Sequence, residues 1–294
     1  MVLLVLAITT VTILFAAPGE ALAWGPIAHL AHGASVLAQL DVLTPALRQL
    51  LRSHPDTFLY GCVGADIIQA KRFTRDLRSH CHSWSVAWQL LRESSTPAER
   101  AFAYGYLTHL AADTASHNYF VPLQLIVSFR ATALKHVYWE ARFDAMYPEG
   151  DWTRLRAVLS APYPACDDLM ERVIERTLFS FRTNKRIFSS VMALHGVDQW
   201  RTLMHRVGAR SRYALTDKEA ARYSMLCSDN ALELLHRGEA ARCVALDPTG
   251  KENLARAEQI RKRLRALHRR RQLTPALQHD IMARIVPELR AAIG

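Results

Sequence analysis

The sequence has little of what marks disordered, fibrous or disulfide-built proteins. Only 12 of its 294 residues are glycine and 12 are proline, while half are hydrophobic. That composition excludes collagen-like, low-complexity and disordered chains. The five cysteines are an odd number and form no C-x-x-C pair, so at most two disulfides can form. Strand-like alternation, internal repeats and linker-like segments are missing as well.

Long apolar runs are missing everywhere except at the N-terminus. Residues 2–17 are almost entirely apolar, and Ala21-Leu22-Ala23 matches the small-residue pattern of signal peptidase sites. We therefore expect a signal peptide over residues 1–23, cleavage before Trp24, and an exported protein that is periplasmic or extracellular. The alternative is an uncleaved anchor, for which the run is short, because a spanning helix needs about 20 residues.

Positive charge and histidine are abundant. Lys and Arg number 37 against 27 Asp and Glu, which gives a net charge of +10, and there are 13 histidines. A basic balance suits phosphate esters, lipid headgroups or nucleic acid without choosing among them. The charge is concentrated over residues 251–271, where leucines recur at helical spacing. This segment is either a packed helix with a solvated basic face or a surface attracted to anionic membranes.

Helix signals dominate the chain after the leader, so we predict an all-α fold. Thr96-Pro97-Ala98-Glu99 is a capping box that begins a helix reaching about Asn118. We divide the chain into a core over residues 24–150 and a helical C-terminal region over residues 151–294. Further helices are expected over residues 46–52, 131–146, 167–182, 197–207, 216–237 and 251–271.

The capped helix carries possible metal ligands on one side. His109, Asp113 and His117 follow one another at four-residue spacing, and His136 and Glu140 repeat that spacing on the next predicted helix. A helix commonly presents an imidazole and a carboxylate to one cation in this way, and the mixture suits Zn²⁺ best. Further candidate ligands precede this helix: His29, His32, Asp66, His80 and His82.

These candidates exceed the needs of one tetrahedral zinc ion. Two or three zinc ions close together would polarise the oxygens of a phosphate ester and acidify the attacking water. The pattern therefore favours a phosphodiester hydrolase.

Taken in combination, the motifs resemble the bacterial zinc-dependent phospholipase C family, whose helical fold and trinuclear zinc site are shared with fungal single-strand nucleases. The resemblance covers roughly residues 24–146. It is carried by WGPIAH, LYGCVGADI, SHCHSW, FAYGYLTHLAADTASHNYFVP and HVYWE.

The resemblance implies a ligand set. The free amine and carbonyl oxygen of Trp24 would bind one zinc together with His29, and Asp113 would bridge to a second zinc. The second ion would be completed by Asp66, His80 and His109, and the third would be held by His117, His136 and Glu140. Asp66 would also orient or deprotonate the attacking water. Of the two neighbouring histidines His80 is preferred and His82 is the substitute, and His32 is a weaker substitute for His29.

The spacing between Asp113 and His117 departs from the family. Its better-known members have five residues between the bridging Asp and the next His, and this chain has three. A tightened turn could still deliver His117. The aromatic residue that follows the site Asp in some phosphatidylcholine-cleaving members is Ile67 here, so headgroup choice does not transfer.

The leading interpretation is an exported zinc-dependent phospholipase C that releases diacylglycerol and a phosphorylated headgroup from a phospholipid membrane; the sequence leads us to infer no protein partner. A second interpretation keeps the zinc site but takes single-stranded nucleic acid, with Tyr119, Phe120 and Trp139 as possible stacking platforms. A third is a zinc-stabilised envelope protein without turnover.

Overall fold

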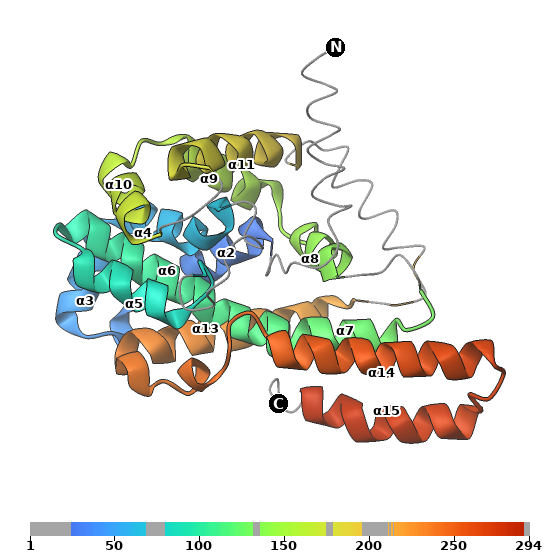
Figure 1. The fold of residues 1–294 in the computed structure, drawn as a ribbon. Coiled ribbons are helices and arrows are strands. Elements are labelled where there is room, and N and C mark those ends of the chain that lie inside the picture. Colours follow the sequence, from blue (N-terminus) through green and yellow to red (C-terminus); the bar gives the residue numbers. More distant parts are fainter. Residues whose placement is uncertain are drawn as a thin grey trace, which may run out of the picture.

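The computed structural model describes residues 25–68, 80–131, 136–174, 179–195, 211, 213 and 215–290. Within these ranges the chain is helical and forms no strand, which confirms the all-α fold (Figure 1). No helix in them is both long and apolar enough to cross a membrane. The expected signal peptide, Trp24 and the helix expected over residues 197–207 lie outside the described residues.

The helices follow one another along the chain. In order they are α2 (Pro26–Leu37), α3 (Pro45–Ser53), α4 (Pro55–Cys62), α5 (Trp84–Glu93), α6 (Pro97–Ala115), α7 (Val121–Val127), α8 (His136–Asp144), α9 (Glu149–Ser160), α10 (Pro164–Val173), α11 (Phe181–His195), α13 (Asp217–Arg237), α14 (Lys251–Arg269) and α15 (Pro275–Arg290). Short 3₁₀ turns are η1 (Leu40–Val42), η2 (Gly64–Ile67), η6 (Gly238–Ala240) and η7 (Arg242–Ala245), and η5 (Ser116–Phe120) is a π-helical turn.

Local capping explains where the best-predicted helices begin. The Thr96 side chain accepts a hydrogen bond from the Glu99 amide, and the Glu99 carboxylate accepts one from the Thr96 amide, so the capping box of α6 is confirmed. The single helix expected over residues 167–182 is wrong. α10 ends at Val173 and α11 begins at Phe181, because Ile174 adopts an extended conformation that the helix cannot continue.

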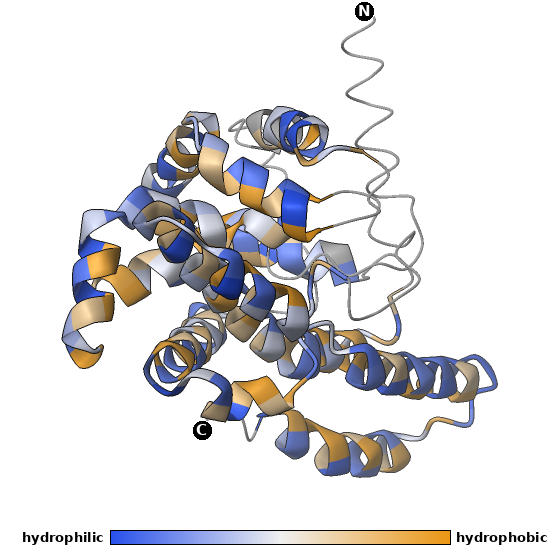
Figure 2. Ribbon diagram, turned by 60° about the vertical axis from the view of Figure 1, so that its left-hand side comes forward, coloured by the Kyte–Doolittle hydropathy of each residue, from blue (hydrophilic) through white to orange (hydrophobic). Residues whose placement is uncertain are grey.

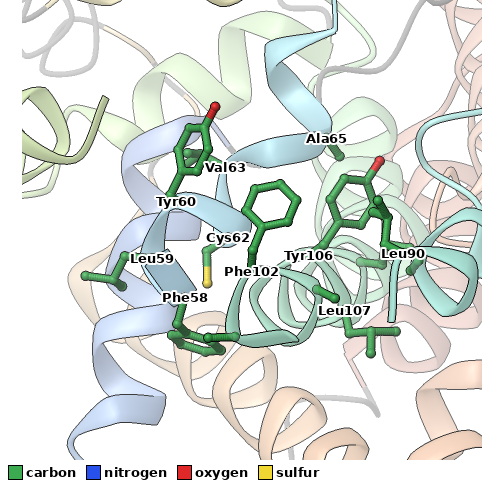
Figure 3. Close-up of a cluster of buried hydrophobic side chains, with 14 of the residues drawn as sticks. Phe58, Leu59, Tyr60, Cys62, Val63, Ala65, Leu90, Phe102, Tyr106 and Leu107 are labelled. Carbon is green, nitrogen blue, oxygen red and sulfur yellow. The ribbon is translucent and has the colours of Figure 1, made fainter. Parts of the chain in front are cut away.

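The crossing of α4 and α6 fixes the centre of the fold. A Cβ atom on Gly61 would lie 2.0 Å from the Phe102 carbonyl oxygen, and one on Gly105 would lie 2.0 Å from that of Phe58. Only glycine allows two helix backbones to approach so closely. Around the crossing, buried side chains from both helices interdigitate, among them Phe58, Tyr60, Phe102 and Tyr106 (Figure 3).

The two halves of the sequence share the hydrophobic core. α13 packs against α6, and each of the two buried clusters contains residues from both sides of Gly150. α14 and α15 form an antiparallel hairpin beside α7 that extends from the body of the molecule (Figure 1). Hydrophilic residues line much of α14 (Figure 2). All five cysteines are buried thiols.

Candidate metal centre

Four separate elements bring five titratable side chains together in the interior. We call them the five-residue cluster: His29 on α2, Asp66 in η2, His82 in the turn before α5, and His109 and Asp113 on α6. Each is at most 2% exposed. Their sequence separation shows that tertiary packing, and above all the α4–α6 crossing, assembles this cluster.

The two carboxylates stand among the three imidazoles. Nε2 of His29 lies 3.2 Å from Asp113 Oδ1 and 3.9 Å from Asp66 Oδ2. Nε2 of His82 lies 3.4 Å from Asp66 Oδ1 and 3.4 Å from Asp113 Oδ2. Nε2 of His109 lies 3.2 Å from Asp113 Oδ2 and 3.2 Å from Nε2 of His82. Asp113 thus contacts all three rings, and its two oxygens face different histidines.

These separations fit zinc coordination. Zn–N bonds of about 2.0–2.1 Å in a tetrahedron place neighbouring ligand atoms about 3.3 Å apart. The nitrogen–nitrogen distance and most of the nitrogen–oxygen distances in the cluster are 3.2–3.4 Å. Asp113, with one oxygen toward His29 and the other toward His82 and His109, has the geometry of a ligand shared between two ions.

Backbone contacts orient two of the ligand side chains. Nδ1 of His109 lies 2.9 Å from the Cys62 carbonyl oxygen at the end of α4. Because a carbonyl only accepts, Nδ1 carries the proton and the lone pair of Nε2 is directed into the cluster. On the same helix, the Tyr106 hydroxyl donates to the carbonyl oxygen of Cys81. This bond fastens the turn that carries His82 to α6.

Burial and charge set the protonation of the cluster. Burial, reinforced by His109, lowers the pKa of His29, so its ring is neutral and able to bind a metal. Burial alone would raise the pKa of Asp113, but His109 and His29 hold it well below its usual range. Burial would likewise lower the pKa of His109, and the Asp113 and Asp66 carboxylates raise it instead.

A second group lies at the end of α6. We call it the three-residue cluster: His117 in η5, with His136 and Glu140 on α8. Nε2 of His136 lies 2.6 Å from Glu140 Oε1, and Nε2 of His117 lies 4.0 Å from the same oxygen. Burial, followed by the charge of His117, lowers the pKa of His136 well below its usual range. Nε2 of His117 is buried with no hydrogen-bond partner among the described residues, as expected of a nitrogen that awaits a cation.

A π-helical turn delivers His117. The tightened turn considered for the short Asp113–His117 spacing does not form, because η5 is a π-helical turn and is wider than an α-helical turn. In this turn Nε2 of His117 lies 4.0 Å from Glu140 Oε1 on α8. The Nδ1 atom of His117 lies 2.5 Å from the Pro248 carbonyl oxygen, which orients the ring. Gly250 makes room for this contact, since a Cβ atom there would lie 2.3 Å from the His117 carbonyl oxygen.

The structure also places the two pairs of alternative histidines. Nε2 of His82, the substitute, lies 3.4 Å from both Asp66 and Asp113. The Nδ1 atom of the preferred His80 accepts a hydrogen bond from the His82 amide at 3.1 Å, and His80, Cys81 and His82 form a further group that could hold a metal ion. The H-x-H pattern alone could not decide which ring faces Asp113. His32, the substitute for His29, is buried beside it at a ring-centroid distance of 6.5 Å, and its Nε2 lies 3.5 Å from the Tyr147 hydroxyl.

Asp144 supports the centre and went unnoticed in the sequence. It follows His136 and Glu140 at the same four-residue spacing on α8, a signal that could have identified it. Its carboxyl group is buried beside the first residues of α2, where a Cβ atom on Gly25 would lie 1.8 Å from Asp144 Oδ2. Burial raises the pKa of Asp144 well above its usual range, and the nearby backbone amides of Ala28 and Ile27 oppose this shift. Asp144 therefore packs against the start of the helix that carries His29.

Fold and clusters together define an all-α protein with two buried sets of zinc-type ligands. The family model described as zinc dependent phospholipase C matches residues 28–188, more than half of the chain. The protein belongs to this zinc-dependent phospholipase C family. No curated protein and no solved structure matches the chain.

Proposed function

We propose that this protein is an exported phospholipase C that hydrolyses membrane phospholipids to diacylglycerol and a phosphorylated headgroup. Family membership supports a zinc-dependent hydrolase of this class. The observation that carries the proposal is the buried convergence of three imidazoles and two carboxylates at zinc-ligand separations. Zinc held there would supply Lewis-acid polarisation of the phosphoryl oxygens and a more acidic water.

The position of each residue in the two clusters suggests its role in this reaction. Asp113, His29, His82 and His109 would hold metal in the five-residue cluster, and His117, His136 and Glu140 would do so at the end of α6. Asp66 has one oxygen near His82 and the other near His29. We assign it the additional role of orienting the attacking water and accepting its proton, a role suited to a buried carboxylate.

Processing belongs to the same proposal. If cleavage exposes the Trp24 amine as a metal ligand, the uncleaved precursor lacks that ligand, because its nitrogen is part of a peptide bond. Activity would then require export and cleavage. A variant with Met directly before Trp24 that remains unprocessed should bind less zinc than the exported protein. Binding of the full zinc complement by that variant would contradict this step.

The deciding experiment compares Asp66→Asn with the unaltered protein. Asn keeps the shape of Asp66 and removes the proton acceptor, so we expect hydrolysis of phosphatidylcholine and phosphatidylglycerol to fall by roughly 10²–10⁴-fold. Circular dichroism should stay unchanged. Zinc per chain, measured by elemental analysis, should be two or three in the unaltered protein. Undiminished hydrolysis by Asp66→Asn would remove the proposed role.

The nuclease alternative shares the metal chemistry and needs a base-stacking surface. Of the three aromatic candidates, Phe120 and Trp139 are completely buried. Only Tyr119 remains partly accessible. Hydrolysis of denatured DNA, assayed in parallel with the phospholipids, separates the two substrates. The non-catalytic alternative predicts bound zinc with no turnover of either.

A further inference from the structure

The far end of the α14–α15 hairpin carries a cluster of exposed positive charge. We call it the basic tip: Lys262, Arg263, Arg269, Arg270 and Arg271, all exposed. The start of α14 lies against His117 through Gly250. Since α14 has 19 residues, the tip lies about 28 Å along the helix from the three-residue cluster. Figure 1 shows the hairpin extending from the body of the molecule.

The apolar residues of the hairpin are already used within the protein. Ala257 and Leu264 are buried, and Ile260, Ile281 and Ile285 pack partly buried against the same hydrophobic cluster. The buried Arg261 donates a 2.8 Å hydrogen bond to the Ala131 carbonyl beyond the end of α7. The hairpin is therefore fixed to the body, and its basic side chains remain on the outside.

Within the part of the chain that the structure describes, the charges of the basic tip have no acidic partner. The hairpin contains the ion pairs Arg256–Glu288 and Arg261–Glu258, and its Arg290 pairs with Glu219 on α13. Among the described residues, no carboxylate lies within 4.0 Å of a charged group of the basic tip. Positive groups gathered without counter-charges produce a local positive potential, which attracts a polyanionic surface.

Arg271 occupies a position that favours glycine. Its φ is 59°, the only positive φ of a non-glycine residue in the described part of the chain. The Gln272 amide bonds the Leu267 carbonyl and the Arg271 amide bonds the His268 carbonyl, which is a Schellman motif with Arg271 at the left-handed position. A side chain is strained there. Arg271 therefore supplies charge to the basic tip at a position where glycine would relieve strain, so Arg271→Gly removes the charge without removing a contact that the fold needs.

We propose that the basic tip docks on an anionic phospholipid surface. The choice of lipid rests on the proposed function, whose substrate lies in a membrane. Residues 251–290 contain no Phe, Tyr or Trp, so the hairpin offers no platform for stacking bases. Leu277, beside the tip in the first turn of α15, is 38% exposed and can enter the headgroup region. Such docking concentrates the enzyme on its substrate while the metal centre stays distant from the contact.

The test measures binding separately from turnover. The triple variant R269Q/R270Q/R271Q is compared with R92Q/R100Q/R154Q, which removes the same charge from exposed positions on α5, α6 and α9. All proteins carry Asp66→Asn, so that vesicles stay intact. Each charge near an anionic bilayer contributes about fivefold, so the tip variant should bind phosphatidylglycerol-containing vesicles on the order of 100-fold more weakly. The control should bind them normally, and salt should weaken binding of the unaltered protein.

A second variant, Arg271→Gly, separates loss of binding from loss of stability, because it is expected to be more stable than the unaltered protein. Relief of strain should raise Tm by about 2–4 °C, while vesicle binding falls about fivefold. With Asp66 restored, the tip variant should hydrolyse a soluble short-chain phospholipid at the normal rate. Unchanged vesicle binding by the tip variant, or equal loss in the control, overturns the docking proposal. Tighter binding to single-stranded DNA than to vesicles overturns it as well. None of these binding outcomes depends on whether the protein is a phospholipase.

Discussion

The five-residue and three-residue clusters use the same kinds of side chain but are built in different ways. The first draws on four elements, and every member is at most 2% exposed. The second draws on η5 and α8 alone, and the His136 side chain is 17% exposed. The first is held by the central helix crossing, while the second depends on one π turn and one distant carbonyl. Because the five-residue cluster is more deeply buried and offers more ligands, we expect it to retain metal longer than the three-residue cluster.

The largest effect on the difference between the two clusters is expected from a substitution at Asp113. Asp113→Asn removes the carboxylate that contacts three imidazoles, and the loss of one partner of a buried ion pair costs about 3–5 kcal/mol. We expect loss of activity, loss of zinc from the five-residue cluster and a lower free energy of unfolding in urea. Asp229→Asn, at an exposed aspartate on α13, is the matched control. Full zinc content in Asp113→Asn would show that this residue is not a shared ligand.

His117 separates the two clusters. His117→Ala removes one of three ligands from a group that contacts solvent, so it should release one zinc ion and leave those of the five-residue cluster in place. Elemental analysis after brief exposure to a chelator measures this directly. The amide of His117→Gln can still donate a hydrogen bond toward Pro248 but supplies no imidazole nitrogen to a metal ion, so this variant separates metal loss from misorientation of η5. Equal loss of zinc from both clusters would mean that they are one unit.

Acid should act on the buried histidines of the metal-free protein. Burial lowers the pKa of His29, His136 and His32, the last to about 3. The unfolded chain takes up these protons near pH 6.5 while the folded protein excludes them, so stability falls as the pH drops below about 6.5. His109, whose pKa is raised, contributes in the opposite direction, stabilising the fold below its folded pKa.

His32 isolates this effect from metal ligation. His32→Asn should reduce the slope of stability against pH by up to about 1.4 kcal/mol per pH unit below pH 6.5. Urea unfolding of the chelator-treated protein at several pH values gives the slope. His279→Asn, at an exposed histidine, is the control. An unchanged slope in His32→Asn would mean that His32 is protonated in the folded protein.

Asp144 gives the smallest expected effect. Loss of a polar side chain that faces the first amides of a helix costs about 1 kcal/mol, and asparagine keeps an oxygen at this position. Asp144→Ala should lower the free energy of unfolding by that amount and weaken zinc binding beside His29, while Asp144→Asn should restore both. Chemical denaturation and zinc titration measure the two effects. Failure of asparagine to rescue would mean that the charge of Asp144, and not its hydrogen bonds, is what matters.

Local signals in the sequence predicted the fold class and the best-capped helices. Thr96 and Thr216 each form the cap that their positions indicate, because capping needs only neighbouring residues. The break after Val173 was not predictable from periodicity, since an amphipathic pattern continues across it. Short helices such as α4 were missed, because they depend on packing against α6 and not on their own propensity.

Helical spacing in the sequence predicted the individual ligand candidates, but it did not predict how they are grouped into two clusters. Spacing places His109 and Asp113 on one side of α6, but the direction of His117 depends on η5, and a π turn has no sequence signature of its own. The approach of His82 to Asp113 depends on the turn that the Tyr106 hydroxyl binds at the Cys81 carbonyl, which lies far from Tyr106 in the sequence. Asp144 contacts a backbone 116 residues earlier in the chain, at Ala28, which no local pattern reveals.

The contact between the Pro248 carbonyl and His117 links the evolution of the C-terminal region to that of the family-matched segment. The segment shared with the family ends at residue 188, whereas the groups that orient His117 and leave space for it lie at residues 248 and 250. Truncation of the chain after residue 188 would thus remove the residues that contact His117, together with α13 and the hairpin. The C-terminal region therefore contributes directly to the three-residue cluster. Exchanging this region between relatives by recombination would also change the residues that orient His117.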